Sequence, residues 1–123
     1  MKKSRTIKFR AWDEDDKEMT YFDRSTSNWS YATDCLWFED LITQFTGLQD
    51  KNRKDIYEGD IIRCFKTYYS TPIEHLGQVV FEKGAFLVGS DTMPDYYMTF
   101  IELDSDWGIE IVGNIYENPE LLE

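Results

Sequence analysis

The amino-acid sequence predicts a mostly β fold: small curled antiparallel sheets with an SH3-like barrel core, plus short helical turns. Short segments alternate apolar and polar residues, which is the period-2 pattern of half-buried strands. In the middle of the chain, Gly-Asp begins an apolar strand, and a loop, Gly-x-Val-x-Phe, a tight turn and another strand follow. Small SH3-like barrels have this order of elements. The length of 123 residues, 41% of them hydrophobic, fits one packed domain spanning residues 1–123.

In the N-terminal part of the chain, the sequence predicts a hairpin, followed by a segment that has two interpretations. Residues 7–22 hold two strand-like segments around a polar turn, which is the pattern of a β-hairpin. Residues 23–33 are rich in Ser, Thr and Asn and predict a surface loop. Two interpretations then stay open: Asp34 can cap a short helix, or Leu41–Phe45 can form a strand. We favour a strand near Thr46.

The middle of the chain predicts a turn-rich stretch that leads into an apolar strand. Ile56–Glu58 predicts one helical turn, which Gly59 can end because glycine adopts a positive φ at no steric cost. The apolar strand follows at Ile61–Phe65. We interpret Lys66–Leu76 as a loop that holds Pro72 and the only histidine of the chain.

The C-terminal part predicts a second hairpin, two strands and a short helix. Residues 77–88 form the hairpin around a Lys-Gly turn. Residues 96–103 and 109–112 have strand patterns. Residues 118–120 are typical of a helix start, with Asn at the cap, Pro at the first position and an acid in the first turn.

Charge and cysteine content narrow the classes of function. The formal net charge is -11, which makes nucleic acid an improbable ligand because phosphate binding depends mainly on Lys and Arg. The two cysteines, Cys35 and Cys64, have no zinc-like spacing and fit a reducing cytosol. No apolar run approaches the roughly 20 residues that span a bilayer. We therefore expect a cytoplasmic protein that binds no membrane.

Two motifs supply candidate interaction residues, and each also has a structural interpretation. In IYEGD, two carboxylates beside a tyrosine can hold a cation or act in acid–base catalysis, but a strand-entry turn explains them as well. In NIYEN, an amide and a carboxylate can line a binding groove, or they can cap and anchor the chain. We favour the structural interpretation and keep as interaction candidates Tyr57, Glu58, Asp60, Asn114, Tyr116 and Glu117.

The sequence gives little support for calcium binding, nucleophilic catalysis or nucleotide binding, and we predict no catalytic residue, metal site or cofactor. The acids around Asp13 suggest calcium, but positions six and twelve of an EF-hand loop would be Glu18 and Arg24 instead of Gly and Glu. His75 lacks an accompanying nucleophile motif such as G-x-S-x-G. Neither a G-x-G-x-x-G sequence nor a Walker loop occurs.

Five motifs in this order resemble the YopX family of phage and prophage proteins: FRAWD, TGLQD, IYEGDI, GQVVF and GNIYENPELL. The resemblance implies a phage or prophage origin, a mostly β fold and a place in the cytoplasm of the bacterial host. It carries over no catalytic residues. The chain has Arg53 where the family usually has Gly in a D-K-N-G turn, and residues 23–35 and 65–76 match the family little.

The preferred hypothesis is a non-enzymatic interaction protein that binds a host or phage protein, with a homo-oligomer as a variant. Its basis is the absence of a catalytic constellation together with aromatic residues in or beside loops. One alternative is a DNA mimic that inhibits a host DNA-binding protein, suggested by the net charge of -11. Another is a metal-dependent hydrolase built from carboxylates such as Glu58, Asp60, Glu102 and Asp104.

Overall fold

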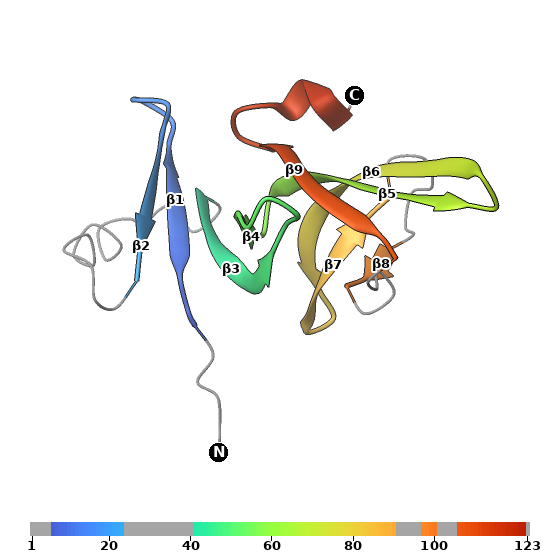
Figure 1. Cartoon of the computed structure of the whole chain (residues 1–123). Helices are drawn as coiled ribbons and strands as arrows, with labels where there is room; N and C mark the ends of the chain where they lie inside the picture. The colour runs from blue at the N-terminus through green and yellow to red at the C-terminus, as the bar shows by residue number, and fades with distance from the viewer. Residues whose placement is uncertain (1–5, 24–40, 91–96, 101–105, 123) are drawn as a thin grey trace, which may run out of the picture.

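A computed structural model of the chain describes residues 6–23, 41–90, 97–100 and 106–122. Within these residues, nine strands form two antiparallel sheets (Figure 1). The four-stranded sheet has the order β2-β1-β3-β4, and the five-stranded sheet has the order β8-β7-β6-β5-β9. The strands are β1 (Phe9–Asp13), β2 (Glu18–Phe22), β3 (Ile42–Gln49), β4 (Asp55–Tyr57), β5 (Asp60–Tyr68), β6 (Thr71–Glu82), β7 (Ala85–Gly89), β8 (Tyr97–Thr99) and β9 (Gly108–Asn114). The prediction of a mostly β fold is confirmed.

The four-stranded sheet contains the predicted N-terminal hairpin, because β1 and β2 pair from Phe9↔Phe22 to Asp13↔Glu18. Successive side chains of β1 point to opposite faces. Ala11 packs with Phe22 in a small apolar cluster on one face, while Arg10 and Trp12 contact the second sheet and its C-terminal turn on the other. The strand interpretation of residues 41–45 is confirmed by β3, whereas the predicted loop and the Asp34 cap lie outside the described residues.

The helical turn predicted at Ile56–Glu58 is wrong, because Asp55–Tyr57 forms strand β4 against β3. An extended backbone sends the fully buried Ile56 into the main core, while Tyr57 pairs with Phe45 of β3. The positive φ expected at Gly59 is present, at 90°. Glu58 and Gly59 therefore make a tight turn that carries the chain directly from the first sheet into the second.

The loop predicted at Lys66–Leu76 is also wrong. Strands β5 and β6 pair without interruption from Ile61↔Gln78 to Tyr68↔Thr71. In a two-residue hairpin, the closing pair shares hydrogen bonds and the next pair does not, so Pro72, opposite Thr67, occupies a site that needs no N–H toward β5. His75 lies in β6 opposite Cys64, not in a loop. The sequence signal failed because a proline can be accommodated at this register.

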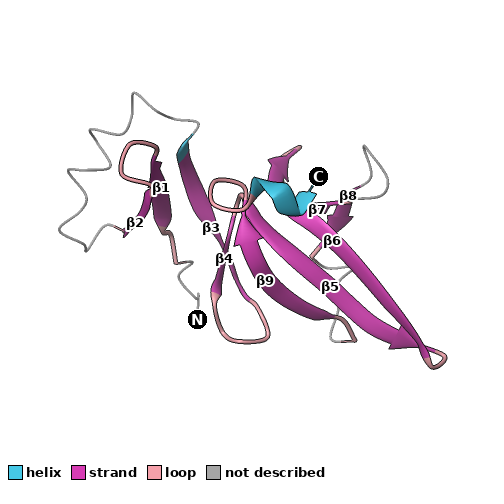
Figure 2. Ribbon diagram, turned by 90° about the horizontal axis from the view of Figure 1, so that it is seen from above, coloured by secondary structure: helices cyan, strands magenta, loops and turns pink. Residues whose placement is uncertain are grey.

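The second predicted hairpin is confirmed, since β6 and β7 pair around Lys83 and Gly84, both at positive φ. At Gly77, the backbone of β6 lies very close to the backbone of β7. A Cβ atom there would lie 1.9 Å from the carbonyl oxygen of Gly89. The five-stranded sheet curls at this point into a half-barrel (Figures 1 and 2). Its core contains Ile56, Ile62, Cys64, Val79 and Val88.

The C-terminal segment contains the predicted elements, but their lengths differ from those expected. Strand β9 begins at Gly108 and ends at Asn114, so it is longer than expected. Strand β8 covers only Tyr97–Thr99, and most of the remaining predicted strand lies outside the described residues. The short helix is a 3-10 helix at Pro119–Leu122. Among the described residues, the helices are too short and too polar to cross a membrane.

Candidate functional site

The candidate site is an open cleft of about 540 Å³ where the two sheets meet, here called the junction cleft. The first sheet contributes side chains of β1, β2 and β4, and the second sheet contributes the start of β5 and the end of β9. Both β4 and β9 are edge strands of their sheets. The lining residues are Arg10, Tyr21, Lys54, Asp55, Tyr57, Asp60, Ile111, Val112, Gly113, Asn114 and Glu117.

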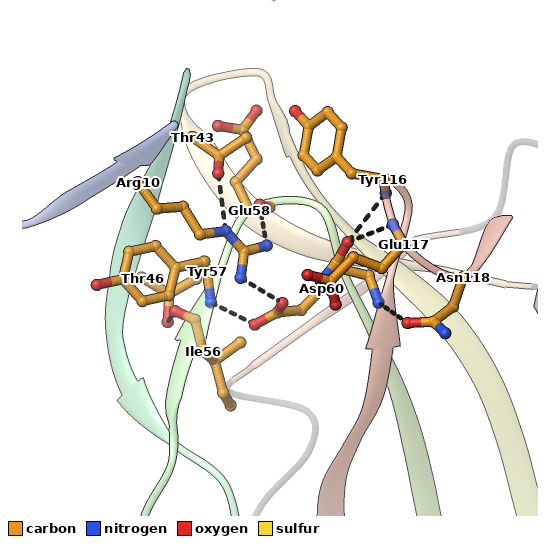
Figure 3. A network of polar contacts seen from close by, with 11 residues as sticks. Arg10, Thr43, Thr46, Ile56, Tyr57, Glu58, Asp60, Tyr116, Glu117 and Asn118 are labelled. Atoms are coloured by element: carbon orange, nitrogen blue, oxygen red, sulfur yellow. Dashed lines mark hydrogen bonds and ion pairs between the residues drawn. The ribbon is translucent and has the colours of Figure 1, made fainter. Parts of the chain in front are cut away.

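A buried ion pair joins the sheets at the floor of the cleft (Figure 3). The Arg10 Nη1 atom lies 2.8 Å from Asp60 Oδ1, and both side chains are at least 96% buried. The guanidinium also donates through Nε to the Thr43 hydroxyl at 3.1 Å and through Nη2 to the Glu58 carbonyl oxygen at 3.2 Å. The Cζ atom of Arg10 lies 4.8 Å from the centre of the Tyr57 ring. Arg10 is therefore held on every side by this junction.

The ionisation of the floor residues follows from burial. Burial raises the pKa of Asp60, while the Arg10 charge and the Tyr57 backbone N–H, which donates at 2.8 Å, oppose that rise. Burial and then the Asp55 charge raise the pKa of Tyr57 to about 12, so its phenol is neutral at pH 7. Burial also raises the pKa of Glu58. Burial thus disfavours the ionised form of these side chains, and the positive charge of Arg10 stabilises the Asp60 carboxylate.

Asn114 organises the C-terminal wall of the cleft. It lies opposite Asp60 in the β5–β9 pairing. Its Oδ1 atom accepts the backbone N–H groups of Tyr116 at 3.0 Å and Glu117 at 2.9 Å, and its Nδ2 atom donates to the Glu117 carboxylate at 3.3 Å. Asn118 Oδ1 in turn accepts the Asn114 backbone N–H at 3.3 Å. The NIYEN motif is thus a turn built around one amide side chain.

A second buried acid positions the rim of the cleft. The Asp50 carboxylate accepts backbone N–H groups of Asn52 and Lys54 in its own turn, and of Ile111 in β9, at 2.8 to 3.0 Å. Although burial opposes ionisation, these donors hold the pKa of Asp50 below its usual value. The turn that carries Lys54 is thereby tied to β9 across the cleft.

The six residues predicted as interaction candidates come together here. Tyr57, Asp60, Asn114 and Glu117 line the cleft. Glu58 adjoins it through its carbonyl contact with Arg10, and Tyr116 stacks on Trp12 with ring centres 5.9 Å apart. Asn118 stands directly before the 3-10 helix, as predicted, and its side chain accepts the Asn114 backbone N–H.

Sequence reasoning missed Arg10, the residue at the centre of the site. An alternating strand pattern presents a charged residue as solvent-facing, and Arg10 is 3% exposed. The available signal was its position on the same face of β1 as the large apolar Trp12, which is 5% exposed. Strand residues two apart share a face, so a tryptophan that needs burial predicts burial of its arginine neighbour.

In this geometry the floor of the cleft has a structural role. The Oδ1 atom of Asp60 lies in the ion pair with Arg10 and the Oδ2 atom accepts the Tyr57 backbone N–H, so both oxygens of this carboxylate already have a structural partner. Within the described segments, no group of three His, Cys, Asp or Glu side chains could hold a metal ion. Of the four acids named for a hydrolase, Glu102 and Asp104 lie outside those segments.

These features define a class of protein: a small two-sheet β protein with an open cleft at the sheet junction and a buried ion pair beneath it. The family model described as YopX protein matches residues 8–123. The chain belongs to the YopX family. It is also similar to a solved structure, the crystal structure of protein EF1440 from Enterococcus faecalis, with 29% sequence identity and a TM-score of 0.60. That match covers 98% of this chain and 100% of the other. No curated protein matches the chain.

Proposed function

We propose that this YopX family member is a non-enzymatic interaction protein that binds another protein of the phage or its host through the junction cleft. The assignment to a phage or prophage gene, and to the host cytoplasm, comes from the family resemblance. An SH3-like barrel remains our interpretation of the curled half-barrel, because the Gly-Asp entry to β5 and the β5-β6-β7 meander both agree with it.

The observation that carries the proposal is the contrast between the floor and the rim of the cleft. The floor charges of Arg10 and Asp60 are paired with each other and buried. At the rim, Tyr21 is 53% exposed and Val112 is 38% exposed, and both line the hollow. Exposed aromatic and aliphatic groups around a concave site are typical of protein recognition, and a buried, paired acid is a poor catalyst.

The test is capture from a nuclease-treated lysate of the bacterial host, with the wild-type protein and two matched variants as baits. Val112→Asp places a charge at the rim of the cleft. Phe81→Asp makes the same kind of change at a 51% exposed residue of β6 that does not line the cleft. We expect one stoichiometric partner that is retained by Phe81→Asp and lost by Val112→Asp. Equal capture by all three baits would contradict a role for the cleft.

A DNA mimic is the second candidate, favoured by the net charge of -11. The described residues include one exposed acidic turn, where Glu14, Asp15 and Asp16 follow β1. If the captured partner is a DNA-binding enzyme, duplex DNA should displace this protein from it. Displacement that depends on the acidic turn and not on Val112 would favour mimicry over cleft binding.

A further inference from the structure

The outer edge of β9 is covered by a turn of the same chain. Strand β9 is an edge strand of the five-stranded sheet, so one row of its backbone groups has no neighbouring strand among the described residues. Residues 50–54, here called the strap, join β3 to β4 and lie against this edge (Figure 2). The Lys51 backbone N–H donates to the Ile109 carbonyl oxygen at 2.9 Å, and the Asp50 carboxylate accepts the Ile111 N–H at 3.0 Å. The strap therefore takes the place of a further strand at two backbone groups of β9.

Asp50 is the centre of this contact. Its Oδ1 atom accepts the backbone N–H groups of Asn52 and Lys54 inside the strap, at 2.8 and 2.9 Å, while its Oδ2 atom accepts the Ile111 N–H of β9. Asp50 is 6% exposed. One carboxylate therefore both shapes the strap and holds it on the sheet, whereas two paired strands would be held by a series of independent backbone hydrogen bonds.

The further contacts of the strap with β5 and β9 come from one exposed side chain. The strap has the sequence DKNRK, which contains no apolar residue, and its last four residues are exposed. The Lys51 Nζ atom lies 3.2 Å from Glu110 Oε2 and 5.0 Å from the centre of the Phe65 ring, and the Lys51 side chain is 43% exposed. Ion pairs and cation–π contacts at exposed sites contribute little. A segment without buried apolar contacts opens at a lower free energy than the core of a protein.

The backbone around the strap can change conformation without disturbing the core. Gly47, just before the strap, has φ 90°, and a Cβ atom there would meet no neighbour within 4 Å. Strands β3 and β4 pair with a register shift between their two matched positions. Arg53 adopts φ 63°, which is a strained value for a residue with a Cβ atom. After the strap, Asp55 is fixed by its ion pair with Lys8. The strap therefore lies between a glycine hinge and a fixed anchor.

We propose that the strap is a movable wall of the junction cleft and that Asp50 is the latch that holds this wall closed. Lys54 lines the cleft from the strap, and Ile111 lines it from β9. When the bonds from Asp50 and Lys51 to β9 break, the strap moves away as a local unit while both sheets stay folded. The cleft is then wider, and one donor and one acceptor of β9 are uncovered at its border. The inference rests on the proposed function, in that it takes the cleft, whose width the latch sets, to be a binding site.

Amide hydrogen exchange of the wild-type protein, followed by NMR, tests the latch without any substitution. Backbone groups of successive residues point to opposite edges of a strand, so the Glu110 N–H faces β5 while the Ile111 N–H faces the strap. After correction for intrinsic rates, we expect the Ile111 amide to be protected but to exchange at least about tenfold faster than the Glu110 amide. Equal protection of the two amides would overturn the inference, because the strap would then open only together with the sheet. An unprotected Ile111 amide would also overturn it, because the strap would then not be closed.

Two substitutions within the strap assign the protection of Ile111 to Asp50. Asp50→Ala removes the acceptor of the Ile111 N–H, whereas Asn52→Ala changes an exposed side chain of the same turn and keeps its backbone N–H. The measured quantity is the ratio of the Ile111 and Glu110 exchange rates within each protein, because a general loss of stability affects both amides. We expect this ratio to rise at least about tenfold in Asp50→Ala and to keep its wild-type value in Asn52→Ala. An unchanged ratio in Asp50→Ala, or the same rise in both variants, would refute the latch.

The proposed function is judged separately, by capture of a partner. If the Ile111 amide behaves as expected but no partner depends on Val112, the latch stands and the proposed function fails. If a partner depends on Val112 while Ile111 and Glu110 exchange at equal rates in the wild-type protein, the cleft binds with a fixed wall and the latch alone is refuted.

Discussion

Breaking the Arg10–Asp60 ion pair one partner at a time should be far more damaging than removing both charges together. In Arg10→Met, the Asp60 carboxylate keeps only the Tyr57 backbone N–H at 2.8 Å. In Asp60→Asn, the guanidinium loses its counter-ion while its side chain stays about 96% buried. Removing one partner of a buried pair costs about 3–5 kcal/mol, a large part of the roughly 5–15 kcal/mol that stabilises a domain.

The double variant Arg10→Met/Asp60→Asn removes both charges and retains an amide oxygen for the Tyr57 N–H. It leaves the Thr43 hydroxyl and the Glu58 carbonyl oxygen without the donor Arg10, and each lost hydrogen bond costs about 0.5–1.5 kcal/mol. We therefore expect the double variant to be less destabilised than the sum of the single variants by at least about 2 kcal/mol.

Urea unfolding followed by tryptophan fluorescence measures this coupling. With a slope of about 1–3 kcal/mol per M, each single variant should lower the midpoint by about 2 M. Single-variant effects that simply add in the double variant would refute the reasoning, since they would show that the two charges do not interact.

The pH dependence of Arg10→Met gives an independent check of the same pair. Burial already raises the pKa of Asp60, and loss of the Arg10 charge removes its main opposition. A carboxyl group whose folded pKa lies above its unfolded value gains folded-state stability as the pH falls through the folded pKa. The deficit of Arg10→Met relative to wild type should therefore be smaller at about pH 5 than at about pH 7. A deficit that grows on acidification would contradict the assignment.

Three further predictions concern single positions. Asp50→Asn should cost about 1–3 kcal/mol, because one amide oxygen cannot replace a carboxylate that accepts three backbone N–H groups. Those donors lower the pKa of Asp50 against the effect of burial, so the stability that the Asp50 carboxylate contributes is present above about pH 4 and is lost as the pH falls through the folded pKa. Thermal melting at several pH values should therefore show a weaker acid dependence in the variant. Arg53→Gly should stabilise the protein by up to about 1 kcal/mol in urea unfolding, because Arg53 has φ 63°, while glycine at the neighbouring Lys54 should not. In a Cys35→Ser background, a thiol reagent at about pH 8 should modify Cys64 on the order of 10²-fold more slowly in the native protein than in urea, because burial raises the pKa of its thiol to about 11; equal rates would refute its burial.

Local alternation was enough to predict the hairpins of residues 7–22 and 77–88, because one face of each is buried and the turn residues are ordinary. It was not enough for the β5–β6 hairpin. Pro72 suggests a loop unless the pairing register of the two strands is known. That register depends on the turn at Tyr69, and a tyrosine is not a residue type that predicts a turn. Long-range pairing settles such cases, and one sequence does not contain it.

The same limit applies to the site. The polar motifs marked Asp60 and Asn114, and the structure brings them to opposite positions of adjacent strands. Nothing in either motif indicated Arg10, which comes from a strand 50 residues earlier and reaches Asp60 only because the two sheets pack at this corner. Local sequence predicts which residues form turns, whereas the partner of a buried charge depends on tertiary packing.

The division between floor and rim also separates two kinds of mutant phenotype. The motif residues Asp60 and Asn114 hold backbone and charge in place, so their substitution should lower the urea midpoint and lose partner binding only as a consequence of unfolding. Val112 is exposed, so its substitution should change binding at an unchanged midpoint. Measuring both quantities on the same variants decides the point: an Asn114→Ala protein with wild-type stability and no partner would show that the NIYEN turn contacts the partner directly, and the structural interpretation of the motif would then be wrong.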